Sequence, residues 1–237
     1  MAQVPMLIYC ADGNARFAQI AIDAGFRYGA QLPNTVYHPV YFADQNWRNP
    51  NREAYMAALA KHRPEMATVL DWEQESQLDE VLDWAEEAAL SVQKILIVPK
   101  VVGGIGHLPR SIGGKPVVLA YSVPTKFSGT NVPLWEFRGW PVHLLGGQPH
   151  RQIEIWRYLH NVVSTDGNYA QMMAVRYNEF WSSGGWHELC NHDGHIENDA
   201  PYKAFEHSCK NIMAAWGYLV DTRPPGAGPL GAGAGRR

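Results

Sequence analysis

The chain has 237 residues, of which 46% are hydrophobic and 11% aromatic. This length and composition fit one sizeable domain with a full core and exclude a globally disordered chain. The formal net charge is −3, so the chain as a whole does not attract nucleic acid, and any such binding needs a local basic patch.

The first residues and the cysteine count bear on the cellular compartment. The start, Met-Ala-Gln-Val-Pro-Met-Leu-Ile, lacks the basic region and the long apolar core of a secretory signal. No apolar run approaches the roughly 18 residues that a membrane helix needs. Three cysteines argue against a disulfide framework and leave free thiols or metal ligands. We therefore expect a soluble, cytoplasmic protein without a membrane partner.

Apolar strands and amphipathic helices alternate along the chain. Short buried runs predict seven strands, at 6–10, 40–43, 66–70, 94–98, 117–120, 142–145 and 162–166. Apolar residues at helical spacing predict helices over 17–24, 51–61, 78–89, 151–160, 169–181 and 202–219. Such repeats imply a parallel sheet with both faces covered. We expect a (β/α)8 TIM-type barrel, compact or irregular and without a regular eighth strand, rather than an open doubly wound sheet.

Three of the predicted strands end in an aspartate, namely Asp44, Asp71 and Asp166. The carboxyl ends of barrel strands meet on one rim, so these three side chains are expected to converge. Convergent carboxylates are costly to bury unless they bind a cation or perform acid-base and nucleophilic chemistry. The alternative for each aspartate alone is a helix cap, and for Asp166 it is the N-cap of the helix over 169–181.

Two glycines precede Asp166 by one helix and one strand. Gly146 and Gly147 end the apolar run at 142–145, where the chain can turn sharply and a ligand can approach the backbone closely. Pro149 then suits the first turn of a helix. The sequence therefore places Gly146 and Gly147 beside a ligand site.

A basic and aromatic segment lies between the fifth and sixth predicted strands. Residues 125–140 contain Lys126, Trp135, Arg138 and Trp140. This mixture can contact the backbone and bases of a nucleic acid, and it is equally typical of a surface loop packed by its tryptophans.

A cluster of cysteine and histidine follows the last predicted strand. Cys190, His192 and His195 lie within one turn-rich segment, and mixed ligands of these types fit four-coordinate zinc. His207 and Cys209 point about 200° apart on a helix, so only one completes the set. We choose Cys209 because a thiolate is the stronger ligand. His187 is a spare candidate, and the alternative is a histidine-rich loop without metal.

These patterns also predict the domain organisation. Residues 1–182 carry the barrel, and residues 183–221 hold the zinc-binding segment and a C-terminal helix of the same domain. Residues 222–237 consist mostly of glycine, alanine and proline, which predicts a disordered tail. A zinc site made only of protein ligands is structural rather than catalytic.

The order of these features resembles the tRNA-guanine transglycosylase superfamily, especially its phage and bacterial branch that inserts 7-deazaguanine bases into DNA. That family is a (β/α)8 barrel with a zinc subdomain near its C-terminus. Its zinc signature, Cys-x-Cys-x2-Cys with a later histidine, keeps its spacing in Cys190-x-His192-x2-His195. The resemblance covers residues from about 10 to 219.

The same resemblance implies roles for the aspartates. The family's Gly-x-Gly-x-Pro segment before the nucleophile looks like Gly146-Gly147-Gln148-Pro149 before Asp166. Asp44 would be the acid-base residue. Asp44-Gln45-Asn46-Trp47 keeps only the aspartate and an aromatic of the family motif, and Trp47 would be a platform on which the base stacks. Asp71 would read the guanine edge, and Gly146 and Gly147 would form the floor of the base pocket, where the absent side chains make room for a flat ring.

We therefore expect a transglycosylase that exchanges guanine in nucleic acid, DNA rather than RNA, for a free 7-deazaguanine base. Two alternatives stay open: a barrel hydrolase of nucleosides or glycosides that uses the same carboxylates, and a non-catalytic, zinc-stabilised nucleic-acid-binding protein. The sequence leaves the oligomeric state open, with a homodimer as one possibility.

Overall fold

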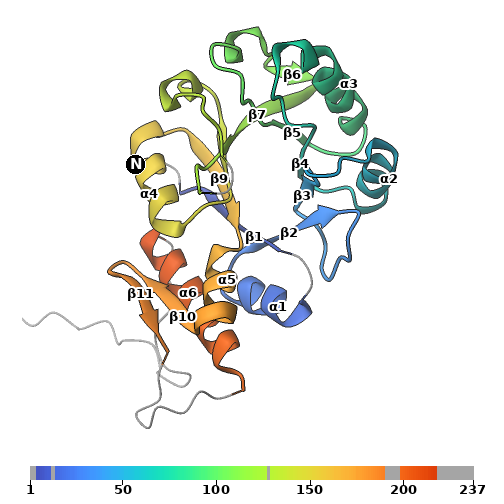
Figure 1. Cartoon of the computed structure of the whole chain (residues 1–237). Helices are drawn as coiled ribbons and strands as arrows, with labels where there is room; N and C mark the ends of the chain where they lie inside the picture. Colours follow the sequence, from blue (N-terminus) through green and yellow to red (C-terminus); the bar gives the residue numbers. More distant parts are fainter. Residues whose placement is uncertain (1–3, 12–13, 127–128, 190–197, 218–237) are drawn as a thin grey trace, which may run out of the picture.

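Eight parallel strands close into a TIM-type barrel, which confirms the expected fold class (Figure 1). The computed structural model describes residues 4–11, 14–126, 129–189 and 198–217. Each barrel strand pairs with its neighbour along the chain, β9 pairs with β1, and β5 pairs directly with β7. The barrel strands are β1 (Met6–Cys10), β2 (Arg27–Leu32), β3 (Phe42–Gln45), β4 (Met66–Thr68), β5 (Lys94–Ile97), β7 (Lys115–Ser122), β8 (Val142–Leu145) and β9 (Val162–Gly167).

The strand that the sequence did not reveal is β2. Its interior positions hold Gly29 and Gln31 rather than branched apolar residues, so the segment lacks a buried apolar run. The site of Gly29 has no room for a side chain, because a Cβ there would lie 3.0 Å from atoms of Cys10 and Phe42. Residues 33–41, all described, lead to β3 without a helix. The barrel therefore has a regular eighth strand, contrary to our expectation.

The helices surround the barrel, and two of them begin at an asparagine cap. Asn51 caps α2, because its side chain accepts the Ala54 N–H at 3.0 Å. Asn14 caps α1 in the same way. The helices are α1 (Ala15–Asp23), α2 (Arg52–His62), α3 (Leu78–Ala88), α4 (Pro149–Leu159), α5 (Tyr169–Tyr177) and α6 (Ala200–Ala215). Short connections contain the 3-10 turns η1 (Glu75–Gln77), η2 (Ile105–His107) and η3 (Leu134–Phe137) and the two-residue strand β6 (Ser111–Ile112).

The barrel interior is apolar in its depth and polar at its carboxyl end. Alternate residues of a strand share a face, so Phe42 and Asp44 of β3 both point inward. Phe42 packs there with Ile8, Met66 and Leu96, and Asp44 stands nearer the open end. The same alternation directs Asp166 of β9 to the interior. Asp44 and Asp166 therefore both lie at the carboxyl-terminal opening of the barrel, which we call the mouth.

The C-terminal part differs from the prediction at two helix ends, because α6, expected over 202–219, ends at Ala215 and α5 is also shorter than expected. The helix expected over 169–181 ends at Tyr177, because Asn178 adopts a left-handed conformation with φ 53°. The chain then forms the hairpin of β10 (Glu179–Ser182) and β11 (Gly185–Glu188), where Trp181 pairs with Trp186. The predicted domain boundary between residues 182 and 183 falls in the turn of this hairpin.

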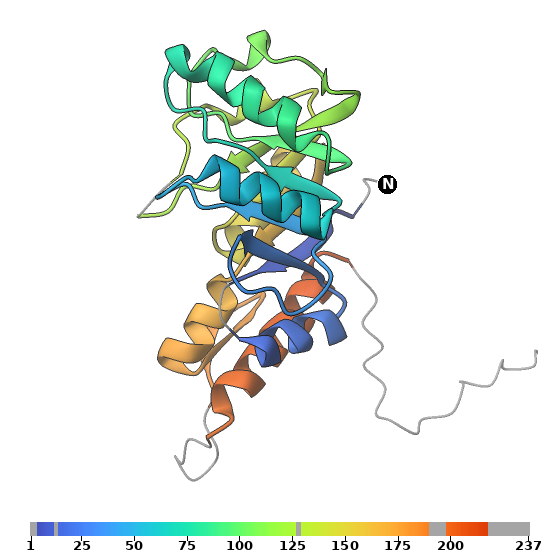
Figure 2. The same ribbon diagram turned by 90° about the vertical axis from the view of Figure 1, so that its right-hand side faces the viewer.

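The last described helix, α6, packs against α1, α5 and β10, so these elements gather on one side of the barrel (Figure 2). The predicted tail, 222–237, lies outside the described residues. Within the described ranges, no helix combines the length and the apolar character needed to cross a bilayer.

Candidate active site at the barrel mouth

The carboxyl ends of the barrel strands border a cavity of about 230 Å³. The structure brings five of the predicted site residues together around it. They come from four different strand ends, so barrel closure alone makes them neighbours. The cavity is lined by Asp44, Trp47, Asp71, Gly146 and Asp166, together with Cys10, Ala11, Gln31, Gln45, Lys100, Ser122, Leu145, Gly167 and Asn168.

Asp166 is held in one orientation by two hydrogen bonds. Its Oδ1 accepts the Gly146 N–H at 3.0 Å and is 3.1 Å from Nε2 of His143. Gln152 also fixes the backbone here, because its Nε2 donates to the Asp166 carbonyl at 2.7 Å. In the described part of the chain no donor reaches Oδ2, which leaves that oxygen free for a ligand.

The capping alternative for Asp166 is wrong. The N-cap of α5 is Asn168, and the Asp166 carboxylate points into the barrel instead. The residue is 7% exposed, so burial and two N–H donors, rather than a helix end, define its surroundings.

His143 supports Asp166 from within the barrel and was not among the predicted site residues. It is fully buried, and its Nδ1 lies 2.8 Å from Oγ of Ser164. A carboxylate only accepts hydrogen bonds, so Nε2 carries the proton toward Asp166 and Nδ1 accepts from Ser164. A histidine at an interior position of a buried strand is the signal that could have revealed it.

Asp44 lies in the same mouth and has a different electrostatic environment. Its Oδ1 accepts the hydroxyl of Thr68 at 3.0 Å. Burial, and next the negative charge of Asp166, raise the pKa of Asp44 to about 8. The two carboxyl groups therefore differ: Asp44 keeps a proton at neutral pH beside the hydrogen-bonded carboxylate of Asp166.

Asp71 is paired with a lysine that sequence reasoning did not select. Lys100 Nζ lies 2.7 Å from Asp71 Oδ2 and 2.9 Å from Glu73 Oε1. Burial raises the pKa of Asp71, and the bond to Lys100 offsets part of that rise. Lys100 follows strand β5, so the strand-end rule that identified the aspartates could also have identified this cation.

Trp47 stands at the rim with 44% of its surface exposed. The Lys100 ammonium lies 5.5 Å from its ring centroid, and the Arg48 guanidinium lies 5.0 Å away. Trp47 thus places an exposed aromatic ring, with two cations over it, at the edge of the aspartate cavity.

The two predicted floor glycines line different cavities. Gly146 borders the mouth with φ 67°, and a Cβ there would meet no atom within 4 Å. Gly147, with φ 92°, packs so closely that a Cβ would lie 2.5 Å from the Val123 side chain. Gly147 lines a separate small cavity of about 40 Å³ instead of the mouth, so only Gly146 occupies the expected place.

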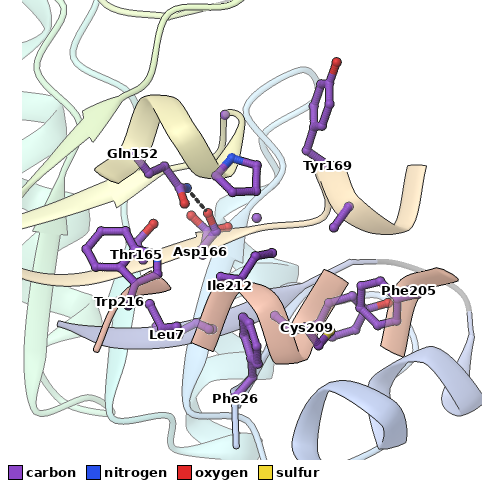
Figure 3. Close-up of a pocket in the computed structure, with 16 residues that line it drawn as sticks. Leu7, Phe26, Gln152, Thr165, Asp166, Tyr169, Phe205, Cys209, Ile212 and Trp216 are labelled. Carbon is purple, nitrogen blue, oxygen red and sulfur yellow. Dashed lines mark hydrogen bonds between the residues drawn. The ribbon is translucent and has the colours of Figure 1, made fainter. Parts of the chain in front are cut away.

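Cys209 lies in that small cavity, between α6 and the barrel (Figure 3). Its neighbours there include Leu7, Phe26 and Ile212, and burial raises the pKa of its thiol. A zinc ligand needs a thiolate and polar co-ligands, so the environment of Cys209 does not fit the predicted role.

The other predicted ligands, Cys190, His192 and His195, lie outside the described residues. The described ranges contain no group of three potential ligands that could hold a metal. Zinc binding by this segment therefore stays a prediction. On α6, the His207 ring packs against Phe180 of the hairpin, which also contacts His187.

Comparison with known proteins gives a family and no curated relative. No curated protein matches the sequence. Among solved structures, N-(5'-phosphoribosyl)anthranilate isomerase from Pyrococcus furiosus is 12% identical, with a TM-score of 0.37 over 89% of this chain and 99% of the isomerase. A likeness this weak says nothing about the reaction. A family model described as "Family of unknown function (DUF6610)" matches residues 19–217, and the chain therefore belongs to that family.

Proposed function

We propose that this protein is a transglycosylase that exchanges guanine in DNA for a 7-deazaguanine base. The observation that carries the proposal is the pairing of Asp166 and Asp44 in one mouth. Asp166 has an oriented carboxylate with a free Oδ2, and Asp44 has a pKa of about 8. Glycosyl transfer with a covalent intermediate needs one ionised nucleophile and one group that exchanges a proton.

In the first half-reaction, Asp166 Oδ2 attacks C1′ as the bond from C1′ to N9 of guanine breaks. The proton of Asp44 passes to the departing guanine, so the base leaves neutral. A covalent aspartyl-sugar intermediate remains. The donors from His143 and Gly146 hold the attacking carboxylate in line, which lowers the entropic cost of the step.

In the second half-reaction, N9 of the 7-deazaguanine attacks C1′ and displaces the Asp166 carboxylate. The N9 proton passes to the ionised Asp44, which restores both groups to their starting states. Trp47 would stack on the base, Asp71 would accept hydrogen bonds from its edge, and the space beside Gly146 would receive the ring.

The test is mass analysis of nucleosides from DNA incubated with the protein and a set of 7-deazaguanine bases. Wild-type protein should incorporate one of them and form a DNA adduct that survives denaturation. Asp166→Asn should abolish both the exchange and the adduct, because an amide does not displace the base. Asp83→Asn, an exposed change on α3, should behave as the wild type.

Other outcomes would reassign the protein. If Asp166→Asn exchanged bases at the wild-type rate, Asp166 would not be the nucleophile. Release of base without incorporation would identify a hydrolase of nucleosides or glycosides. DNA affinity that survives substitution of Asp44 and Asp166, with no turnover of any base, would identify a binding protein.

A further inference from the structure

A second, larger concavity lies beside the mouth, between residues 124–126, the start of α4 and the length of α5. Its volume is about 800 Å³. It is lined by Lys126, His150, Arg151 and Arg176 and by the aromatic residues Tyr169 and Tyr177, among others. We call this concavity the basic groove.

The basic groove concentrates positive charge in a protein whose net charge is −3. Lys126, Arg151 and Arg176 are all exposed, and Glu179 is the one acidic residue among the lining side chains. Arg151 also forms an ion pair with Glu154 at 2.9 Å, but both side chains are about half exposed, and such pairs are weak. The groove is therefore the kind of local basic patch that phosphate binding requires.

The start of α4 adds to this positive potential. Its first turn contains no acidic residue, and the N-terminal end of a helix carries partial positive charge. Gln148, the N-cap, makes no capping bond and instead donates its amide to Tyr169 OH at 2.9 Å. This bond ties the entrance of α4 to the first residue of α5.

Aromatic and sulfur-bearing side chains share the groove with the cations. Tyr177 is 55% exposed, and Met172 and Met173 line the same wall. Surfaces that bind single-stranded nucleic acid combine cations that follow the backbone with aromatic rings on which bases stack. The composition of the groove matches this combination better than it matches a site for a lone small anion.

The basic groove is continuous with the mouth. A shallow depression of about 250 Å³ shares Ala11 and Asn168 with the mouth, and it shares Met172 and Arg176 with the groove. Gly146 of the mouth and Gln148 of the groove are also two residues apart. One chain could therefore pass through the groove and present a single unit to the aspartates.

We infer that the basic groove binds the sugar-phosphate backbone of the DNA strand whose base enters the mouth. This inference rests on the proposed function. A base must leave the stack before its C1′ is accessible, and the strand next to it must be held during the exchange. Arg151 and Arg176 each neutralise one phosphate.

The test measures the binding of a fluorescent single-stranded oligodeoxynucleotide by fluorescence anisotropy, at several salt concentrations between about 50 and 200 mM. No incoming base is present, so the measurement is independent of the chemistry. The double variant Arg151→Ala/Arg176→Ala should bind more weakly, and its salt slope should fall by about 1.4, since each single-strand phosphate contact contributes roughly 0.7.

The matched control is Lys61→Ala/Arg157→Ala. Both of its residues are exposed, Arg157 shares α4 with Arg151, and neither lines the groove. The control loses the same charge and should keep the wild-type slope. Equal slopes for the groove variant and the wild type, or equal losses in both double variants, would overturn the inference.

The two proposals can fail separately. If the wild type exchanges a base and the groove variant keeps its KM for DNA, the groove assignment fails while the transglycosylase stands. If the groove variant loses affinity and the wild type exchanges no base, the groove stands as a nucleic-acid site and the transglycosylase fails. If both hold, the groove variant should raise KM for DNA and leave kcat at saturating DNA nearly unchanged.

Discussion

Asp44 and Asp166 occupy one cavity and have different surroundings. Asp166 receives two N–H groups, from a histidine ring and from the Gly146 backbone, and these bonds hold its side chain in one orientation. Asp44 accepts the Thr68 hydroxyl, but burial and the charge of Asp166 outweigh its hydrogen bonds and raise its pKa. In the proposed reaction, this raised pKa suits Asp44 to carry the proton, and the fixed orientation of Asp166 suits it to act as the nucleophile.

The raised pKa of Asp44 predicts a pH-dependent stability. Folding raises this pKa from 3.8 to about 8, so between these values the native state holds a proton that the unfolded chain lacks. The stabilisation is full below pH 4 and is lost as the pH rises through 8. Asp44→Asn removes this proton binding, and its Tm should fall less between pH 5 and pH 8 than that of the wild type.

Thermal unfolding at several pH values in this window, monitored by circular dichroism, tests the prediction. Asp83→Asn serves as the control and should follow the wild-type curve, because Asp83 is exposed. A variant at Asp44 with the same pH slope as the wild type would show that this group does not titrate as described.

At the scale of the elements, apolar runs predicted seven of the eight barrel strands. Strand β2 was missed because the packing inside the closed barrel requires a small residue at Gly29. The strand-end rule identified the aspartates, since strand direction decides which ends meet. It could not reveal His143, which lies within a strand, or the bond from Thr68 to Asp44. Those contacts join distant residues and exist only in the closed barrel.

Gly29 provides a test of the packing that closes the barrel. A Cβ there would lie 3.0 Å from Cβ of Cys10 and Cδ1 of Phe42 and 3.1 Å from Cγ2 of Ile8. Gly29→Ala should therefore lower the free energy of unfolding by about 1–3 kcal/mol, measured by urea denaturation. Gly106→Ala, which would meet no atom within 4 Å, should change it by less than about 0.5 kcal/mol. Equal effects of the two changes would contradict this account of β2.

At the scale of the whole molecule, α6 joins parts of the barrel that are distant in sequence. It packs on α1 near the start of the chain and on α5 near its end. Trp216 follows its last turn and lies against Trp156 of α4, with ring centroids 4.9 Å apart. The described C-terminal segment is thus part of the barrel's outer layer, whatever the segment at 190–197 binds.

Truncation of Trp216 tests this attachment. The residue is 1% exposed, so Trp216→Ala should lower the free energy of unfolding by about 3–5 kcal/mol, as for other buried aromatic residues. Trp135→Ala, at a position that is 58% exposed, should have an effect of at most about 0.5 kcal/mol. A similar, small loss in both variants would mean that α6 adds little to the stability of the barrel.

The arrangement of charge around the mouth has a further consequence for the proposed reaction. Among the described lining residues, the cavity sets the carboxyl groups of Asp44, Asp71 and Asp166 against one cation, Lys100, whereas the neighbouring groove sets Lys126, Arg151 and Arg176 against one acid, Glu179. A nucleotide has an uncharged base at one end and an anionic phosphate at the other, so its base suits the cavity and its phosphate suits the groove. The electric field across the rim would therefore orient each incoming nucleotide base-first, and it would reject the phosphate-first approach by repulsion before any contact with the base is made.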